Sequence, residues 1–176
     1  MAKKLVGPND FLVETVQGLA HPGLLLVSRD ARRRPNAMTI GWGSIGIYWG
    51  NPVFVVPVRE SRYTYQCIEK TGDFTVNLLP RKLAHVAEYC GTLSGRDHDK
   101  LAECRLTAVD GGQVKSPIID ECVLCYECKV VHVNDVVPAA LTREISRSCY
   151  PKGDYHRLYF GEILAVHADP HLRRKL

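Results

Sequence analysis

One uninterrupted run of the chain, residues 59–77, constrains the fold more than any other. It reads as a strand end, a polar turn, a short helix from Arg62 to Lys70, and a second strand that begins at Phe74. Gly72 ends the helix, because glycine readily takes the left-handed conformation found just past helix C-termini. A polar turn that leads into a helix predicts a binding place for an anionic ligand.

The turn itself carries groups that suit a phosphate. Ser61 is predicted to be the N-cap of the helix, with Arg59 and Arg62 on either side. The first N–H groups of a helix lack intrahelical acceptors, so a phosphate here would meet N–H donors, a hydroxyl and two guanidinium groups. A capped surface helix with solvated arginines explains the same residues when the segment is taken alone.

Composition and charge bound the class of protein. The chain has 176 residues, 45% hydrophobic and 24% charged, which fits a single domain over residues 1–176 with a sizeable core. Apolar runs are short, so we expect no membrane span, no secretory segment and a cytoplasmic location. The net charge of +4 is concentrated in residues 32–34 and 173–175 without interleaved aromatic residues, so we expect no nucleic-acid partner.

The cysteines raise the question of a metal site. Seven cysteines, an odd number, indicate free thiols rather than a disulfide framework. Cys122, Cys125 and Cys128 have the spacing of part of a zinc or iron–sulfur site, but their segment is β-branched and apolar and reads as a strand. Because side chains alternate along a strand, Cys125 is expected to point away from the other two thiols. We therefore predict no metal ligands, only buried structural thiols.

The hydrophobic pattern predicts six strands and three short helices. The expected strands are residues 24–28, 38–42, 53–58, 74–78, 124–133 and 155–166, and the expected helices are 62–70, 82–89 and 100–103. Glycine and polar residues indicate a loop over 110–117. Strands that dominate in this way, with few helices between them, favour an antiparallel barrel.

Five ordered blocks of the sequence resemble the flavin reductase-like family of FMN-binding split barrels, which includes the flavoredoxins. They are Asn-Ala-Met-Thr-Ile-Gly-Trp-Gly (36–43), Arg-Glu-Ser-Arg-Tyr-Thr (59–64), Gly-Asp-Phe-Thr-Val-Asn (72–77), the run 90–100 and the run 153–163. The blocks span most of the chain, so the match is specific. The resemblance implies a mainly β fold with α elements, an antiparallel six-stranded split β-barrel with a few short helices.

The resemblance also implies a set of site residues. The cofactor-binding residues would be Asn36, Ala37, Met38, Thr39, Trp42 and Ser44 near the flavin ring, Arg59, Ser61, Arg62, Ser94 and Lys100 near its phosphate, and Asn77 on the strand after the helix. His156 matches the family histidine that approaches the flavin or nicotinamide, and it is the catalytic candidate. Taken singly, Trp42 also suits a core, Lys100 a solvated surface and His156 a structural role.

The expected function follows from the resemblance and from what the chain lacks. No nucleophile–base set is present in the sequence, which fits a protein whose flavin carries the redox chemistry. The family implies an oxidoreductase that takes hydride from NADH or NADPH onto FMN and passes electrons to free flavin, an oxygenase or an electron-acceptor protein. A flavoredoxin-like FMN electron-transfer protein with little nicotinamide turnover, and a barrel that carries another cofactor such as haem, are the alternatives.

Two further expectations concern partners. The family places each flavin near a subunit interface, which implies a symmetric homodimer. Trp42, Ile45 and residues 47–49 crowd apolar side chains into a glycine-rich segment, which supports an interface there. The arginine run 32–34 leads directly into Asn36, so these residues would attract the extra phosphate of NADPH, or else form a solvated loop.

Overall fold

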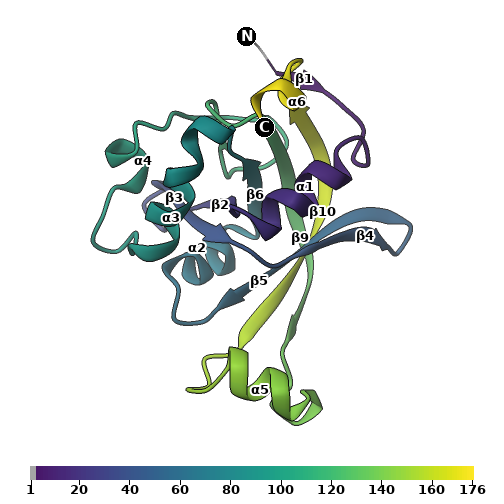
Figure 1. The fold of residues 1–176 in the computed structure, drawn as a ribbon, viewed down its shortest axis with the longest axis vertical. Helices are drawn as coiled ribbons and strands as arrows, with labels where there is room; N and C mark the ends of the chain where they lie inside the picture. The colour runs from purple at the N-terminus through teal and green to yellow at the C-terminus, as the bar shows by residue number, and fades with distance from the viewer. Residues whose placement is uncertain (1–2) are drawn as a thin grey trace.

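The computed structural model describes residues 3–176. Its centre is one antiparallel sheet with the strand order β3-β2-β6-β9-β10-β5-β4, and β1 pairs with β10 (Figure 1). Within the described part of the chain the two end strands, β3 and β4, are not paired with each other, so the barrel stays open. The expected class, a mainly β split-barrel fold with helices, is confirmed.

The eight strands of this sheet, all among residues 3–176, include the six that the sequence predicts. They are β1 (Lys4–Leu5), β2 (Leu24–Arg29), β3 (Pro35–Ile40), β4 (Ser44–Tyr48), β5 (Asn51–Arg59), β6 (Asp73–Leu78), β9 (Leu124–Asp135) and β10 (His156–Ala168). A separate pair is formed by β7 (Ala108–Val109) and β8 (Ile118–Ile119). The expected number of six was too low because β1 and β4 were missed.

β4 was missed because its sequence looks like a loop. It lies in a glycine-rich stretch, and glycine is depleted in strands. A two-residue turn at Trp49 and Gly50, with φ of 52° and 81°, folds β4 back onto β5. Positive φ at both central residues is typical of the hairpin turn whose twist matches that of the strands. The turn, rather than strand propensity, therefore makes β4.

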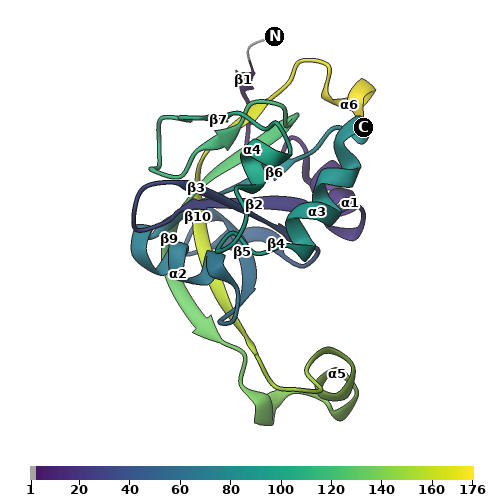
Figure 2. The same cartoon turned by 90° about the vertical axis from the view of Figure 1, so that its left-hand side faces the viewer.

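Short helices lie between the strands in chain order and at the end of the chain. They are α1 (Leu12–Ala20), α2 (Tyr63–Thr71), α3 (Ala84–Thr92), α4 (Lys100–Glu103), α5 (Arg143–Cys149) and α6 (Leu172–Lys175), with short 3₁₀ turns at Arg81–Leu83 and Pro138–Ala140. In Figures 1 and 2, α2, α3 and α4 gather beside β2 and β3. The ends of β9 and β10 extend beyond the body and carry α5 at their tip (Figure 2). We call residues 131–158, which form this extension, the arm.

Two hydrophobic clusters pack on the two faces of the sheet. Leu24 and Leu26 belong to one cluster, with Phe54, Phe74 and Tyr126. Leu25 and Val27, the alternate residues of the same strand, belong to the other cluster. Because successive strand residues face opposite sides, one short strand supplies both cores, and β2 is buried on both faces.

The three closely spaced cysteines divide between these clusters. Cys128 packs in the cluster of Leu24, whereas Cys125 packs in that of Leu25. The prediction that they point to opposite faces is confirmed. Cys122 was expected to share the face of Cys128, and this is wrong: it precedes β9 and joins Cys125. Burial raises the pKa of Cys125 to about 12. Among residues 3–176, no group of three or more His, Cys, Asp or Glu side chains has a metal-binding arrangement.

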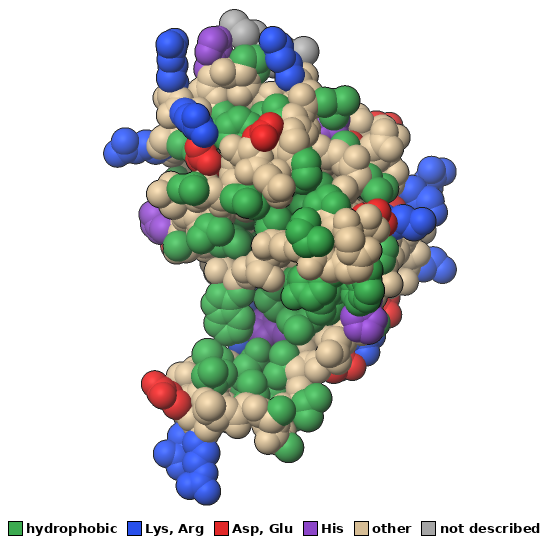
Figure 3. Space-filling view, turned by 90° about the vertical axis from the view of Figure 1, so that its right-hand side faces the viewer, with side chains coloured by type: hydrophobic (Ala, Val, Ile, Leu, Met, Phe, Trp, Pro, Cys, Tyr) green, Lys and Arg blue, Asp and Glu red, His purple; other side chains and the backbone are tan. Residues whose placement is uncertain are grey.

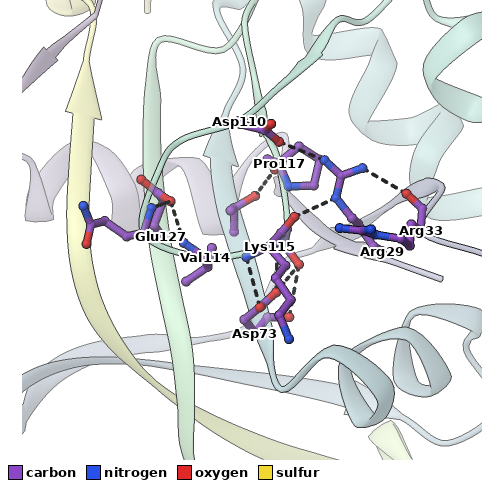
Figure 4. Close-up of polar contacts among 11 residues, drawn as sticks. Arg29, Arg33, Asp73, Asp110, Val114, Lys115, Pro117 and Glu127 are labelled. Carbon is purple, nitrogen blue, oxygen red and sulfur yellow. Dashed lines mark hydrogen bonds and ion pairs between the residues drawn. The ribbon is translucent and has the colours of Figure 1, made fainter. Parts of the chain in front are cut away.

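Two buried carboxylates tie the loop 110–117 to the sheet (Figure 4). Asp73 accepts hydrogen bonds from the backbone N–H groups of Lys115 and Ser116, each at 3.1 Å, and from the Ser116 hydroxyl at 2.5 Å. Glu127 accepts from the N–H groups of Gln113 at 2.8 Å and Val114 at 3.1 Å. The predicted loop is therefore present, and it is held by side chains that the strands present to it.

No helix within residues 3–176 has the length and apolar character needed to cross a membrane.

Candidate functional site

Two cavities lie next to each other, and Met38 and Arg62 line both of them. The first, of about 210 Å³, we call the aromatic cavity; its other lining residues are Thr39, Ile40, Gly41, Trp42, Pro57, Arg59 and His156. The second, of about 120 Å³, we call the cationic cavity; its other lining residues are Asn36, Ser61, Tyr63, Thr64, Cys90, Gly91, Thr92, Leu93, Ser94, Gly95, Arg96 and Lys100. Four separate stretches of the chain thus line two adjacent cavities, which together we call the crevice.

The aromatic cavity is bordered by Trp42 and His156. Their ring centroids lie 5.1 Å apart, and the Trp42 side chain is half exposed while His156 is buried. Burial lowers the pKa of His156 to about 4, and the nearby charges of Arg59 and Arg62 add to this effect. His156 is therefore neutral at neutral pH.

Arg59 lines the aromatic cavity, but its guanidinium already makes hydrogen bonds to the arm. Its guanidinium donates to the backbone oxygens of Asp154 at 2.7 Å and Cys149 at 2.9 Å. It also lies over the ring of Tyr150, 5.0 Å from the centroid. In this structure Arg59 therefore joins the arm to the crevice, and fewer of its donors remain for a ligand.

The cationic cavity holds a buried lysine. Lys100 is 4% exposed, and its Nζ donates to the backbone oxygens of Cys90 and Leu93, each at 3.0 Å. Burial lowers its pKa from the usual lysine value. No carboxylate of the described residues pairs with Lys100, Arg62 or Arg96, which together line this cavity. Three cations without a protein counterion favour an anionic ligand.

The start of α2 also faces the cationic cavity. Tyr63 and Thr64 begin the helix, and their N–H groups belong to the first turn, which has no intrahelical acceptors. The prediction that Ser61 caps this helix is wrong: the N-cap is Arg62, with no side-chain cap. The Ser61 hydroxyl donates instead to the Asp154 carboxylate at 2.8 Å. The Asp154 carboxylate of the arm therefore accepts the hydrogen bond that the sequence analysis assigned to a phosphate.

One buried polar atom in the crevice lacks a partner. Asn36 is 5% exposed, and its Nδ2 donates to the Thr64 hydroxyl at 2.8 Å. Its Oδ1 has no hydrogen-bond partner among residues 3–176. A buried acceptor without a donor costs about 1–3 kcal/mol. A ligand with hydroxyl groups would remove this cost.

Ten of the thirteen predicted site residues line the two cavities. They are Asn36, Met38, Thr39, Trp42, Arg59, Ser61, Arg62, Ser94, Lys100 and His156. The structure thus brings together residues from distant parts of the sequence, as the family pattern predicts. Three other predicted residues lie elsewhere.

Asn77 is the clearest correction. It is fully buried in β6, where its Oδ1 accepts from the Ile119 N–H at 3.0 Å and its Nδ2 donates to Thr75 at 2.8 Å. Its amide holds β8 against the sheet, so it is not available to a ligand in this crevice. Ala37 packs in the second core cluster and lines a neighbouring cavity of about 250 Å³, and Ser44 is exposed on β4. Neither lines the crevice.

Sequence reasoning missed several residues of the site. Arg96 lines the cationic cavity, donates to the Ser61 backbone oxygen at 3.1 Å and lies 5.3 Å from the centroid of the Tyr63 ring. Its signal was available, because it stands between Ser94 and Lys100 in a matching block. Tyr150 and Asp154 had no comparable signal, since their roles depend on how the arm folds back.

The arginine run is only partly free. Arg34 pairs with Asp30 at 2.9 Å, and Asp30 also accepts the N–H groups of Arg32 and Arg34. Those hydrogen bonds and the Arg34 charge hold the pKa of the Asp30 carboxyl below its usual value, although burial opposes them. Arg32 and Arg33 are exposed. Arg34 therefore stabilises its own loop through Asp30, and Arg32 and Arg33 are the two arginines of the run that could bind a ligand.

Together these features fit a phosphorylated ligand with a planar ring. The cationic cavity supplies uncompensated charge and first-turn N–H groups, and Asn36 supplies an unused acceptor in the same cavity. The aromatic cavity offers Trp42, Met38 and Pro57 as apolar walls, with a neutral imidazole beside them.

Comparisons with known proteins agree with this arrangement. A protein from Archaeoglobus fulgidus, itself uncharacterized, is 34% identical over 137 residues, which are 77% of this chain and 67% of that relative. Flavoredoxin of Desulfovibrio vulgaris (Miyazaki F) superposes with a TM-score of 0.68 at 29% identity, over 85% of this chain and 70% of that one. Flavoredoxin from Methanosarcina acetivorans gives a TM-score of 0.68 at 27% identity, over 85% and 69% of the chains.

The family assignment rests on more than these pairs. The chain spans 53% to 70% of the length of the curated relatives that it matches. A family model described as the flavin reductase like domain matches residues 16–176, which include every block that carries the resemblance. The chain therefore belongs to the flavin reductase-like family.

Proposed function

We propose that this chain binds FMN across the two adjacent cavities, with the phosphate in the cationic cavity and the ring in the aromatic cavity. The observation that carries this proposal is the group of three cations, Arg62, Arg96 and buried Lys100, that no carboxylate of residues 3–176 neutralises. A buried unpaired charge is costly, and a phosphate dianion would compensate it.

Each part of the crevice has a task in this proposal. Arg62, Lys100 and the first turn of α2 bind the phosphate, and Asn36 accepts a hydroxyl of the chain that links phosphate and ring. β3 is an end strand of the sheet, so its outward backbone groups have no strand partner among residues 3–176. Because backbone groups of successive strand residues point to opposite sides, one of the neighbours Met38 and Thr39 would offer those groups to the polar edge of the ring.

When bound, the flavin supplies the redox chemistry by accepting a hydride from NADH or NADPH. The residues of the chain would bind and orient the flavin and nicotinamide rings, and the electron acceptor would be free flavin, an oxygenase or an electron-acceptor protein. His156 is neutral and lines the aromatic cavity, so it orients a ring without holding a charge there. We assign to this chain the activity of an NAD(P)H-dependent flavin oxidoreductase.

The visible spectrum of the purified protein tests this function. We expect flavin absorption bands, because the site binds FMN, and we expect anaerobic addition of NADH or NADPH to bleach them within the time of an enzyme assay. The control is a sample without a nucleotide. A flavin that stays oxidised with excess NADH and with excess NADPH would contradict the oxidoreductase activity but not FMN binding.

A second function is favoured by the similarity to two flavoredoxins at 29% and 27% identity. In this case the chain is an FMN electron-transfer protein with little nicotinamide turnover. The same anaerobic sample separates the two functions: a carrier is reduced by a low-potential electron donor such as dithionite and reoxidised by a protein partner, but it is reduced slowly by either nucleotide.

We further propose that the protein is a homodimer built on the β4–β5 hairpin. Ile47, Tyr48 and Trp49 are 64%, 41% and 66% exposed, and Phe160 of β10 lies beside them, 5.3 Å from Tyr48 between ring centroids. Figure 3 shows hydrophobic side chains gathered where the arm meets the rest of the molecule. A contiguous apolar patch of this kind on a monomer favours association.

The mass in solution tests the dimer. We expect sedimentation at micromolar concentration to give twice the chain mass of 19.7 kDa, and Trp49→Asp to shift the protein toward the monomer by placing a charge in the interface. Leu5→Asp is the matched control, because Leu5 is 73% exposed on β1, which pairs with the opposite end of β10 from Phe160. A monomeric wild type, or equal effects of both variants, would rule out this interface.

A further inference from the structure

Within the arm, Tyr150 lies against His156, the histidine that lines the crevice. The Tyr150 hydroxyl lies 2.7 Å from Nδ1 of His156, a hydrogen-bond distance, and the residues are 7% and 9% exposed. Tyr150 also stacks on Tyr155, at 4.9 Å between centroids, and lies under the Arg59 guanidinium. The tyrosine is therefore held firmly from both sides, although it does not line either cavity.

Both members of this pair are uncharged at neutral pH. Burial raises the pKa of the Tyr150 phenol above its usual value, so the hydroxyl keeps its proton. Burial lowers the pKa of His156 to about 4, so the imidazole carries one hydrogen only. The groups that face His156 are Arg59 and Arg62, which disfavour a proton, and Asp154, which favours one. A single hydrogen bond thus joins two neutral groups, and only its direction is open.

The direction follows from hydrogen-bond accounting. If Nδ1 donated, the Tyr150 hydroxyl would need another acceptor for its own hydrogen, and none lies within reach among residues 3–176. A buried hydroxyl without an acceptor is unfavourable. The Tyr150 hydroxyl must then donate to Nδ1, and the imidazole hydrogen must be on Nε2. Nε2 has no partner in the described chain, and His156 lines the aromatic cavity.

We propose that Tyr150 is a positioning residue that fixes His156 as a neutral N–H donor, and that the aromatic cavity therefore takes a planar ring bearing a carbonyl or carboxamide oxygen. The identity of the ring rests on the proposed function, since both a flavin and a nicotinamide carry such an oxygen. The state of His156 does not rest on it. Arg59 and Arg62 beside the imidazole disfavour a cationic ring and suit an acceptor oxygen.

Nitrogen NMR on ligand-free protein tests the histidine directly. With ¹⁵N-labelled histidine at pH 7, we expect His156 to show a protonated Nε2 and an unprotonated Nδ1 shifted by an accepted hydrogen bond. Tyr150→Phe keeps the ring packing but removes the hydroxyl, so the hydrogen-bond shift of Nδ1 should disappear. Tyr155→Phe is the matched control and should leave it unchanged. A wild-type hydrogen on Nδ1, or an unchanged Nδ1 in Tyr150→Phe, would overturn the proposal.

Two binding measurements identify the ring. His156→Gln retains an N–H donor, whereas His156→Leu does not, so a lost ligand hydrogen bond should cost His156→Leu about 2- to 12-fold more than His156→Gln. A loss of riboflavin affinity, measured by fluorescence quenching with flavin-free protein, assigns the contact to the flavin. An increase confined to the KM for NADH or NADPH in FMN-loaded protein assigns it to the nicotinamide. Equal behaviour of both variants in both measurements would overturn the ligand assignment, whatever NMR shows.

Discussion

Replacing Arg62 with alanine is expected to weaken FMN binding about 10- to 150-fold while leaving riboflavin affinity nearly unchanged, because a charge-assisted hydrogen bond contributes about 1.5–3 kcal/mol. Arg62 lines both cavities and has no carboxylate partner among residues 3–176, so its charge is available to a phosphate. Riboflavin has the same ring but no phosphate. Titration of flavin-free protein with each ligand, followed by flavin fluorescence, measures the two affinities.

Two further variants serve as a control and a comparison for this measurement. Arg32→Ala removes an exposed arginine outside the crevice and should change neither affinity. Ser61→Ala should weaken FMN less than Arg62→Ala, because the Ser61 hydroxyl is neutral and already donates to Asp154. Equal losses of FMN and riboflavin affinity in Arg62→Ala would show that the arginine supports the ring or the fold rather than the phosphate.

Replacing Asp73 with alanine is expected to lower the free energy of unfolding by about 2 kcal/mol or more, because it strands two backbone donors at a cost of about 1–3 kcal/mol each. Those donors are the N–H groups of Lys115 and Ser116, whereas the Ser116 hydroxyl keeps acceptors in the Ser28 hydroxyl and the Asp73 backbone oxygen. Asp73 is 6% exposed and Ser116 is fully buried, so water cannot easily replace the carboxylate. Urea unfolding, followed by circular dichroism, measures the loss.

Asp110 supplies the matched control for this second prediction. It is a carboxylate attached to the same loop, but its side chain is 84% exposed and its single ion pair is with Arg29 at 2.9 Å. Surface ion pairs contribute about 0–1 kcal/mol, so Asp110→Ala should have a small effect. Similar losses in the two variants would show that the loop does not depend on the buried carboxylate.

Much of this fold could be predicted because its strands are locally encoded. β5 is a largely apolar run, β6 alternates polar and apolar residues, and Gly72 ends α2 at a φ of 69°, in the left-handed region expected of it. β4 could not be predicted from propensity, since it depends on a turn and on pairing with β5. Local sequence patterns thus predict a strand or a helix well where the propensities of its own residues favour that structure.

The errors in the site have a different origin. Ser61 has the residue type of an N-cap, yet Asp154, 93 residues further along the chain, takes its hydroxyl. Asn77 occupies a family position, yet its amide is used by the backbone of β8. In both cases a partner distant in sequence decides which hydrogen bond is made. Such competition cannot be predicted from a local motif, whereas the membership of the crevice could be.

The crevice is made of stretches that lie far apart in the chain, at 36–42, 57–64, 90–100 and His156. An unfolded chain has no such site, so ligand binding and folding are thermodynamically linked. A ligand at 100 times its Kd adds about 2.7 kcal/mol to the free energy of unfolding, a large part of a domain's usual 5–15 kcal/mol. The supply of cofactor in the cell would therefore help to set how long each molecule escapes proteolysis.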